Sequence, residues 1–147
     1  MKIAIVSGKG EGPTKLNAFD NALSNAGIGD VNLIKVSSML EGNAEIVLLP
    51  DLKPGTMIHC VLSTITSNKK GESIHATVGV AVGERLGCVV EKTGVNKDSE
   101  VLKKEVKDMV EYMMNGRGVK IDKLIVEEIN HTVESIGSVV SSIIYLS

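Results

Sequence analysis

The stretch MIHCVLSTITSNKKGESIHATVGVAVGERLGCVVEKTG, residues 57–94, sets the expected fold. It contains three successive runs rich in Val, Ile and Thr, over 57–67, 73–83 and 86–94, separated by turn-forming residues. Apolar and polar residues alternate along these runs, as they do in strands with one buried face. Strands that follow one another through short turns pair antiparallel. We therefore expect an antiparallel sheet at the centre of the chain.

A helical pattern lies on each side of this region. Residues 14–27, TKLNAFDNALSNAG, predict one helix with Thr14 as its N-cap. Residues 98–118 predict a longer helix capped by Asp98 or Ser99. The expected apolar faces are Leu16, Phe19, Leu23 and Ala26 in the first helix and Leu102, Val106, Met109, Val110 and Met113 in the second.

Further strands are expected toward both ends of the chain. These strands are KIAIVSG (2–8), VNLIKVSS (31–38), AEIVLLP (44–50) and two runs within 121–146 that meet at a turn around Gly137. The glycine-rich segment GKGEGPT, residues 8–14, is expected to be a loop. The total of about eight strands and two helices predicts an α+β fold in a single domain over 1–147.

Composition excludes several classes of function. Aromatic residues make up only 2% of the chain and the formal net charge is −2 without a basic patch, so a nucleic-acid partner is not expected. No apolar run approaches the roughly 20 residues of a membrane span, and the apolar run at the N-terminus is too short for a signal sequence. We expect a soluble cytoplasmic protein without a membrane partner. Cys60 and Cys88 lie in apolar runs and are expected to be buried thiols.

Metal and phosphate sites are not favoured by the motifs. His59, His75 and His131 form no metal-spaced pair and there is no C-x-x-C, so no metal is expected. GKGEG, residues 8–12, follows a strand and precedes a helix as phosphate loops do, but it matches neither common phosphate-loop pattern. A plain connection is the favoured interpretation of this segment.

Two carboxylates stand in unusual surroundings. Asp20 lies within an apolar and amide-rich helix, and Glu91 follows the apolar run CVV near the end of a strand. The ordinary interpretation is a solvated charge in both cases. A carboxyl group among apolar neighbours can also have a raised pKa and serve as a proton donor, which makes Glu91 the stronger candidate.

Two adjacent serines, Ser37 and Ser38, interrupt the strand pattern of VNLIKVSSML, residues 31–40. Taken alone they are ordinary polar residues at a strand end. A serine hydroxyl can also attack the preceding carbonyl, shift the acyl group from nitrogen to oxygen, and form an ester that eliminates across Cα–Cβ. The resulting dehydroalanine hydrolyses to a pyruvoyl group. Asn32 carries a side-chain amide of the type that stabilises an oxyanion.

The run EGPTKLNAFDNALSNAGIGDVNLIKVSSML, residues 11–40, resembles the pyruvoyl-dependent arginine decarboxylases of archaea and some bacteria. The resemblance covers nearly the whole chain. Its most specific part is the combination of LNAFD with GIGDVNLIKVSS. The shared elements are LNAFD (16–20), AGIGDVNLIKVSS (26–38), GESI (71–74), VVEKTG (89–94) and HTVE (131–134).

This resemblance implies a self-processing chain. The family cuts itself between two serines, here Ser37 and Ser38, which would give a β chain of residues 1–37 and an α chain of 38–147. Ser38 would become the covalent pyruvoyl cofactor, and Asn32 would assist the cleavage.

The resemblance also implies an activity. A carboxy-lyase of this family converts L-arginine to agmatine and CO₂ through a Schiff base with the pyruvoyl group, in polyamine biosynthesis. Glu91 matches the proton donor of the family. Asp20 matches the residue expected to pair with the substrate guanidinium, and a carboxylate suits that planar cation.

The family folds as an αββα sandwich, the type shared by pyruvoyl-dependent histidine and arginine decarboxylases. Its members assemble as homotrimers of αβ units, and some pair into hexamers of αβ units. The active sites lie between subunits, so Asp20 would serve the pyruvoyl group of a neighbour.

Two other functions stay open at this point. One is the same self-cleaving chemistry on another amino acid, such as histidine or lysine. The other is an uncleaved, non-catalytic trimeric scaffold or a phosphate-binding module.

Overall fold

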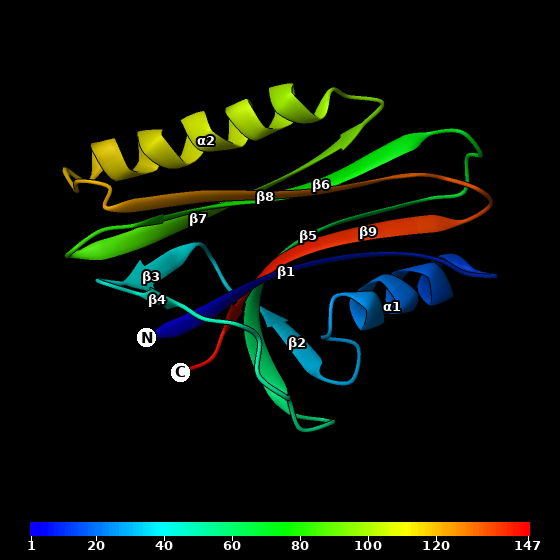
Figure 1. Cartoon of the computed structure of the whole chain (residues 1–147), viewed down its shortest axis with the longest axis horizontal. Helices are drawn as coiled ribbons and strands as arrows, with labels where there is room; N and C mark the ends of the chain where they lie inside the picture. Colours follow the sequence, from blue (N-terminus) through cyan, green and yellow to red (C-terminus); the bar gives the residue numbers. More distant parts are fainter.

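Two β-sheets and two helices form four layers, in the order helix α2, four-stranded sheet, five-stranded sheet, helix α1 (Figure 1). The computed structural model describes all 147 residues. Its elements are β1 (Lys2–Glu11), α1 (Lys15–Asn25), β2 (Asn32–Lys35), β3 (Met39–Glu41), β4 (Glu45–Ile46), β5 (Met57–Ser67), β6 (Ser73–Val82), β7 (Leu86–Val95), α2 (Ser99–Gly116), β8 (Lys123–Thr132) and β9 (Gly137–Tyr145). The predicted α+β class is confirmed, with nine strands where about eight were expected.

The three strands expected over residues 57–94 do not lie in one sheet: β5 belongs to the five-stranded sheet, and β6 and β7 belong to the four-stranded sheet. The five-stranded sheet has the order β2-β5-β9-β1-β4, in which short β2 and β4 add parallel to an antiparallel centre. The four-stranded sheet, β3-β7-β6-β8, is antiparallel throughout. The turn between β5 and β6 therefore joins the two sheets, while β6 and β7 form a hairpin within one of them.

A core of branched aliphatic side chains fills the space between the sheets. Its fully buried members include Ile3, Val78, Val89 and Ile143. Without Trp and with a single Phe in the chain, this core depends on β-branched residues, which pack well on pleated surfaces. The two facing sheets hold the strand ends that carry the candidate site.

Helix α2 covers the four-stranded sheet as its apolar periodicity predicts. Asp98 caps the helix by accepting hydrogen bonds from the N–H groups of Glu100 and Val101. The buried face is Leu102, Val106, Val110 and Met114. The prediction was wrong for Met109, which is 38% exposed. Met114 is buried against the sheet instead, because it lies four residues after Val110 on the same face of the helix.

Helix α1 lies close against β1, and this contact overturns the predicted glycine-rich loop. Strand β1 continues through the glycines to Glu11. A Cβ atom built on Gly8 would stand 2.3 Å from the Ala22 carbonyl oxygen, and one on Gly10 would stand 2.8 Å from the Ala22 nitrogen. The glycines therefore make room for the helix backbone. This segment is a covered strand, which does not fit the phosphate-loop alternative.

The close approach also changes which face of α1 is buried. Ala18 and Ala22 are fully buried, because small side chains suit a short distance between helix and strand. Phe19 and Leu23 pack at the border of this contact. The prediction that Leu16 lies on the buried face was wrong, since this residue is 73% exposed.

Two smaller expectations also differ from the structure. The run 44–50 forms a strand only at Glu45–Ile46, because pairing with β1 is limited to Lys2 and Ile3. The turn expected around Gly137 occupies residues 133–136, and Gly137 is the first residue of β9. Neither helix has the length and apolarity needed to cross a lipid bilayer.

Candidate active site

The segment that carries the two serines crosses from one sheet to the other. β2 ends at Lys35 in the five-stranded sheet, and β3 begins at Met39 in the four-stranded sheet. The Val36 N–H donates to the Cys60 carbonyl of β5 at 3.0 Å. Two residues later the Ser38 carbonyl accepts from the Val89 N–H of β7 at 2.9 Å. The Ser37–Ser38 peptide bond thus lies between two anchors, one on each sheet.

The bond itself is free of the backbone ladder. Antiparallel pairing of Met39 with Cys88 would make Ser38 and Val89 the next pair, which normally exchanges two hydrogen bonds. Only the bond from Val89 N–H to the Ser38 carbonyl is present, and the Ser38 N–H has no backbone partner. Ser37 is exposed and Ser38 is half-buried. We call this arrangement the half-open pair of Ser38 and Val89.

The crossing leaves two open strand edges side by side. β2 pairs with β5 only over Met57–Cys60, and β3 pairs with β7 only over Leu86–Cys88. Beyond these short pairings, both longer strands lack a neighbour on that side. Unpaired edges expose backbone donors and acceptors, which makes such a place available for a ligand or another chain.

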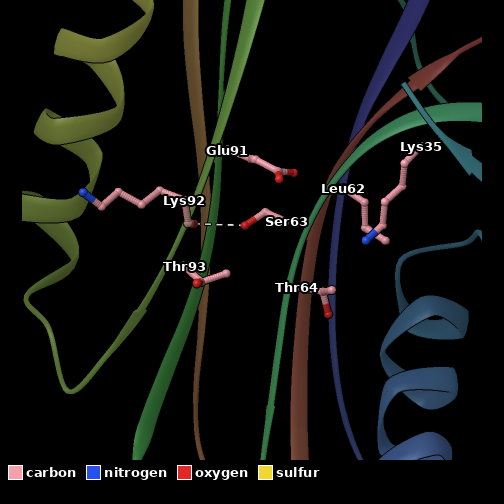
Figure 2. A pocket seen from close by; sticks show the side chains of 7 residues that line it. All are labelled: Lys35, Leu62, Ser63, Thr64, Glu91, Lys92 and Thr93. Atoms are coloured by element: carbon pink, nitrogen blue, oxygen red, sulfur yellow. Dashed lines mark hydrogen bonds between the residues drawn. The ribbon is translucent and has the colours of Figure 1, made fainter. Parts of the chain in front are cut away.

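A cavity of about 310 Å³ lies between the two open edges (Figure 2). Figure 2 shows Glu91 of β7 and Ser63 of β5 pointing into the space between the strands. The Ser63 hydroxyl donates to the Lys92 carbonyl at 2.9 Å and accepts from the Thr77 N–H at 3.2 Å. The lining residues are Lys35, Leu62, Ser63, Thr64, Glu91, Lys92 and Thr93. The buried Ser63 hydroxyl therefore fixes the spacing of the sheets at this cavity.

Glu91 has the electrostatic character of a proton donor. The Glu91 side chain is exposed in the single chain, yet desolvation by the surrounding strands raises the pKa of its carboxyl group above the usual value, and the positive charge of Lys35 opposes that shift. Glu91 lies two residues beyond Val89 on β7, so its Cα is roughly 7 Å along the strand from the residue that holds Ser38. A raised pKa keeps a larger fraction of the group protonated near neutral pH.

The other two predicted site residues lie elsewhere in the single chain. Asn32 begins β2, and its side-chain amide donates to the Gly55 carbonyl at 3.1 Å. Three residues of strand, about 10 Å, separate it from Lys35, and Ser37 lies farther on. Asp20 is exposed on α1, and its side chain makes no hydrogen bond or ion pair. Within one chain, Glu91 therefore lies two residues along β7 from the Val89 that binds Ser38, whereas Asn32 and Asp20 lie farther from this crossing.

The structure adds contributors that the sequence analysis missed. Lys35 is two residues before Ser37, and this position alone could have drawn attention to it. Ser63 and the Val89 N–H could not have been found from motifs, because their roles depend on which strands pair and on how the two sheets face one another. No group of three or more His, Cys, Asp or Glu side chains is placed to hold a metal ion.

Comparison with known proteins gives one consistent result. The family model described as pyruvoyl-dependent arginine decarboxylase matches residues 2–147. A protein of that name from Methanothermobacter thermautotrophicus is 58% identical, over 99% of this chain and 97% of its own length. Proteins of the same name from Methanocaldococcus jannaschii and Pyrococcus furiosus are 39% and 36% identical, over 92% and 84% of this chain and 83% and 80% of their own lengths.

Proposed function

The chain belongs to the pyruvoyl-dependent arginine decarboxylase family, and from that premise we propose that it cuts itself between Ser37 and Ser38 and decarboxylates L-arginine. Its products would be agmatine and CO₂, which makes the enzyme a carboxy-lyase. The cut would give a β chain of residues 1–37 and an α chain of 38–147.

The observation that carries the proposal is the half-open pair of Ser38 and Val89 beside the Glu91 cavity. Self-cleavage requires the Ser38 oxygen to bond to the Ser37 carbonyl carbon while the C–N bond breaks and the nitrogen gains the hydroxyl proton. The Ser38 N–H is free of the ladder, so no sheet hydrogen bond must break for that nitrogen to leave. The flanking residues are held on the two sheets, which limits the conformations of the bond.

The surroundings of Ser38 fit the pyruvoyl group that the family uses. The group would form from Ser38 itself, at the first residue of the new α chain. Once formed, it supplies an electrophilic ketone that accepts electrons from the substrate, as pyridoxal phosphate does in other enzymes. The Val89 N–H would hold the carbonyl oxygen at position 38, and such a donor favours negative charge that develops on oxygen.

Glu91 is the residue we assign to proton transfer during decarboxylation. When CO₂ leaves the substrate, the α-carbon must receive a proton from a donor within reach. Glu91 points into the cavity, and its raised pKa suits a general acid near neutral pH (Figure 2). Lys35 lies in the same cavity and opposes that rise, so it tunes the pH range of the step.

We assign Asn32 to assistance in cleavage and Asp20 to the substrate guanidinium at the site of a neighbouring subunit. A single chain does not bring Asp20 to Ser38, which is what a site shared between subunits requires. Apolar side chains near the crossing support an interface there: Ile34 is 40% exposed, Met57 64% and Met39 37%. The proposed assembly is a homotrimer of αβ units, which could pair into a hexamer of αβ units.

Other features follow from the family assignment. The four observed layers support classification with the αββα sandwich of pyruvoyl-dependent histidine and arginine decarboxylases. We also infer a cytoplasmic enzyme whose product enters polyamine biosynthesis.

The test is a decarboxylation assay on purified wild-type protein and on the Ser38→Ala variant. Wild type should release CO₂ from carboxyl-labelled arginine and form agmatine, while Ser38→Ala should remain one chain and release none. Ser135→Ala is the matched control, because Ser135 is an exposed serine in the 133–136 turn. Release from histidine or lysine in place of arginine would favour the sister activity. An inactive, uncleaved wild type would favour the scaffold.

A further inference from the structure

Tyr145 connects the end of the chain to the residue after the proposed cut. It is the last residue of β9 in the five-stranded sheet and pairs with Ile3. Its hydroxyl donates to the Met39 carbonyl at 2.9 Å, and Met39 begins β3 in the other sheet. Tyr145 is half-buried against the core between the sheets. A single side chain therefore links both sheets next to Ser38.

Together with Val89, this tyrosine holds two consecutive carbonyl groups. The Ser38 carbonyl accepts from the Val89 N–H at 2.9 Å, and the Met39 carbonyl accepts from the Tyr145 hydroxyl at 2.9 Å. We call these two contacts the carbonyl clamp. Both lie on the α-chain side of the Ser37–Ser38 bond. On the other side of the bond, the Val36 N–H bond to Cys60 is the anchor.

We propose that Tyr145 is a positioning residue for self-cleavage. It fixes the Met39–Leu40 peptide plane, while the Val89 N–H fixes the Ser38–Met39 plane before it. With both planes held, the Ser38 hydroxyl stays aligned with the Ser37 carbonyl carbon while the C–N bond between Ser37 and Ser38 breaks. The inference rests on the self-cleavage proposed above. Alignment of reacting atoms is a large source of rate in intramolecular reactions, and small displacements are costly.

The setting of the phenol keeps it a hydrogen-bond donor. Burial raises the pKa of Tyr145, and the neighbouring Cys60 thiol adds to that effect. The phenol is therefore protonated throughout the neutral range. Tyr145 is also the only side chain that donates a hydrogen bond to residues 36–39, so its loss cannot be replaced by another residue already in place.

The chain offers a matched control, because it contains only two tyrosines. Tyr112 is 80% exposed on α2 and makes no side-chain hydrogen bond. Tyr112→Phe removes the same hydroxyl from a place remote from the cut. It also leaves Tyr145 as the only tyrosine, so that fluorotyrosine added during synthesis labels position 145 alone.

The experiment follows cleavage of full-length chains made by pulse-labelled cell-free synthesis. Tyr145→Phe should cleave about tenfold more slowly than wild type, the factor expected for one lost hydrogen bond, while Tyr112→Phe cleaves at the wild-type rate. In the Tyr112→Phe chain, ring fluorination makes the phenol a stronger donor, so cleavage at pH 7 should be faster than with ordinary tyrosine. Thermal unfolding of each variant separates this effect from a loss of stability.

Three results would overturn the inference. A wild-type chain that never cleaves would remove both the proposed function and this role. A wild type that cleaves, with Tyr145→Phe cleaving equally fast, would remove the role of Tyr145 alone. A slow Tyr145→Phe with a lowered unfolding midpoint, together with a rate insensitive to fluorination, would show that the tyrosine only supports the fold.

Discussion

The Glu11 carboxylate offers a quantitative test of how the fold is held together. Glu11 ends β1 and reaches the turn between β8 and β9. Its carboxylate accepts hydrogen bonds from His131 Nε2 at 2.6 Å and from the N–H groups of Ser135 at 2.9 Å, Ile136 at 3.1 Å and Glu134 at 3.2 Å. The perturbation is Glu11→Ala, which removes all four contacts.

The expected loss is about 2–3 kcal/mol of unfolding free energy. A hydrogen bond to a charged group contributes roughly 1.5–3 kcal/mol, but four bonds to one carboxylate do not add, and water can reach an exposed turn after the change. The Glu11 side chain is 25% exposed, which keeps the total near one strong interaction. For a chain of this size, the loss corresponds to a fall of about 5–10 °C in Tm.

The effect should depend on pH in a defined direction. Burial alone would raise the pKa of Glu11, but the hydrogen bonds from His131, Ser135 and Glu134 outweigh it and lower the pKa below the ordinary value of 4.5. A carboxyl with a lowered pKa stabilises the fold above its unfolded pKa, and that contribution is lost as the pH falls through the folded pKa. The difference between wild type and Glu11→Ala should therefore be full at pH 7 and shrink below about pH 4.5.

Urea denaturation measures the free energy of unfolding and its pH dependence, and it is done at fixed protein concentration because the proposed subunit assembly would make stability concentration-dependent. Glu134→Ala is the matched control: it removes an exposed acid from the same turn whose side chain makes no hydrogen bond. The free energy of unfolding of this control should lie within about 0.5 kcal/mol of the wild-type value. Equal midpoints for wild type and Glu11→Ala at pH 7, or a gap that persists unchanged in acid, would refute the reasoning.

Three further predictions concern catalysis and packing. Glu91→Gln should lower kcat by about 100-fold or more, because it removes the general acid. Lys35→Met should move the alkaline fall of the kcat–pH profile to higher pH, because Lys35 no longer lowers the pKa of Glu91. A profile that does not move would contradict the assignment of Glu91. Asp20→Ala should raise KM for arginine about 10- to 100-fold, and an unchanged KM would exclude guanidinium pairing. Gly8→Ala should lower the free energy of unfolding by about 2–3 kcal/mol or more, since the added Cβ would lie 2.3 Å from the Ala22 carbonyl oxygen of the helix. A Cβ at Gly116 has no atom within 4 Å, so Gly116→Ala should leave stability unchanged or raise it slightly in thermal unfolding.

Local patterns were enough to predict the long elements. β5 runs over Met57–Ser67, as the alternating run predicts, and Thr14 and Asp98 cap the two helices. These features depend on neighbours within a few residues, and such neighbours are visible in the sequence.

Features set by contacts between distant segments could not be predicted in the same way. The glycines of β1 read as a loop because a strand buried under a helix and a flexible connection share the same composition. Only the distance from Gly8 to Ala22 of α1 distinguishes the two. The short β4 likewise depends on how far β1 remains available for pairing.

The candidate site shows the same division. Ser37, Ser38 and Glu91 could be proposed from motifs; the fold places the serines at the crossing between the sheets and Glu91 two residues along β7 from the Val89 that binds Ser38. The Val89 N–H and the Tyr145 hydroxyl carry no motif, since a backbone amide or a tyrosine at the end of a strand gains its role only from strand register. The roles of Asp20 and Asn32 remain predictions, and that of Asp20 concerns a neighbouring subunit.

Intact mass spectrometry of the purified wild-type protein tests the central claim most directly. The account predicts two species, residues 1–37 and residues 38–147, with the larger one carrying a pyruvoyl group in place of an N-terminal serine. The Ser38→Ala variant should remain whole. A wild-type preparation that contains only the 15.6 kDa chain, or one split at another bond, would contradict the account.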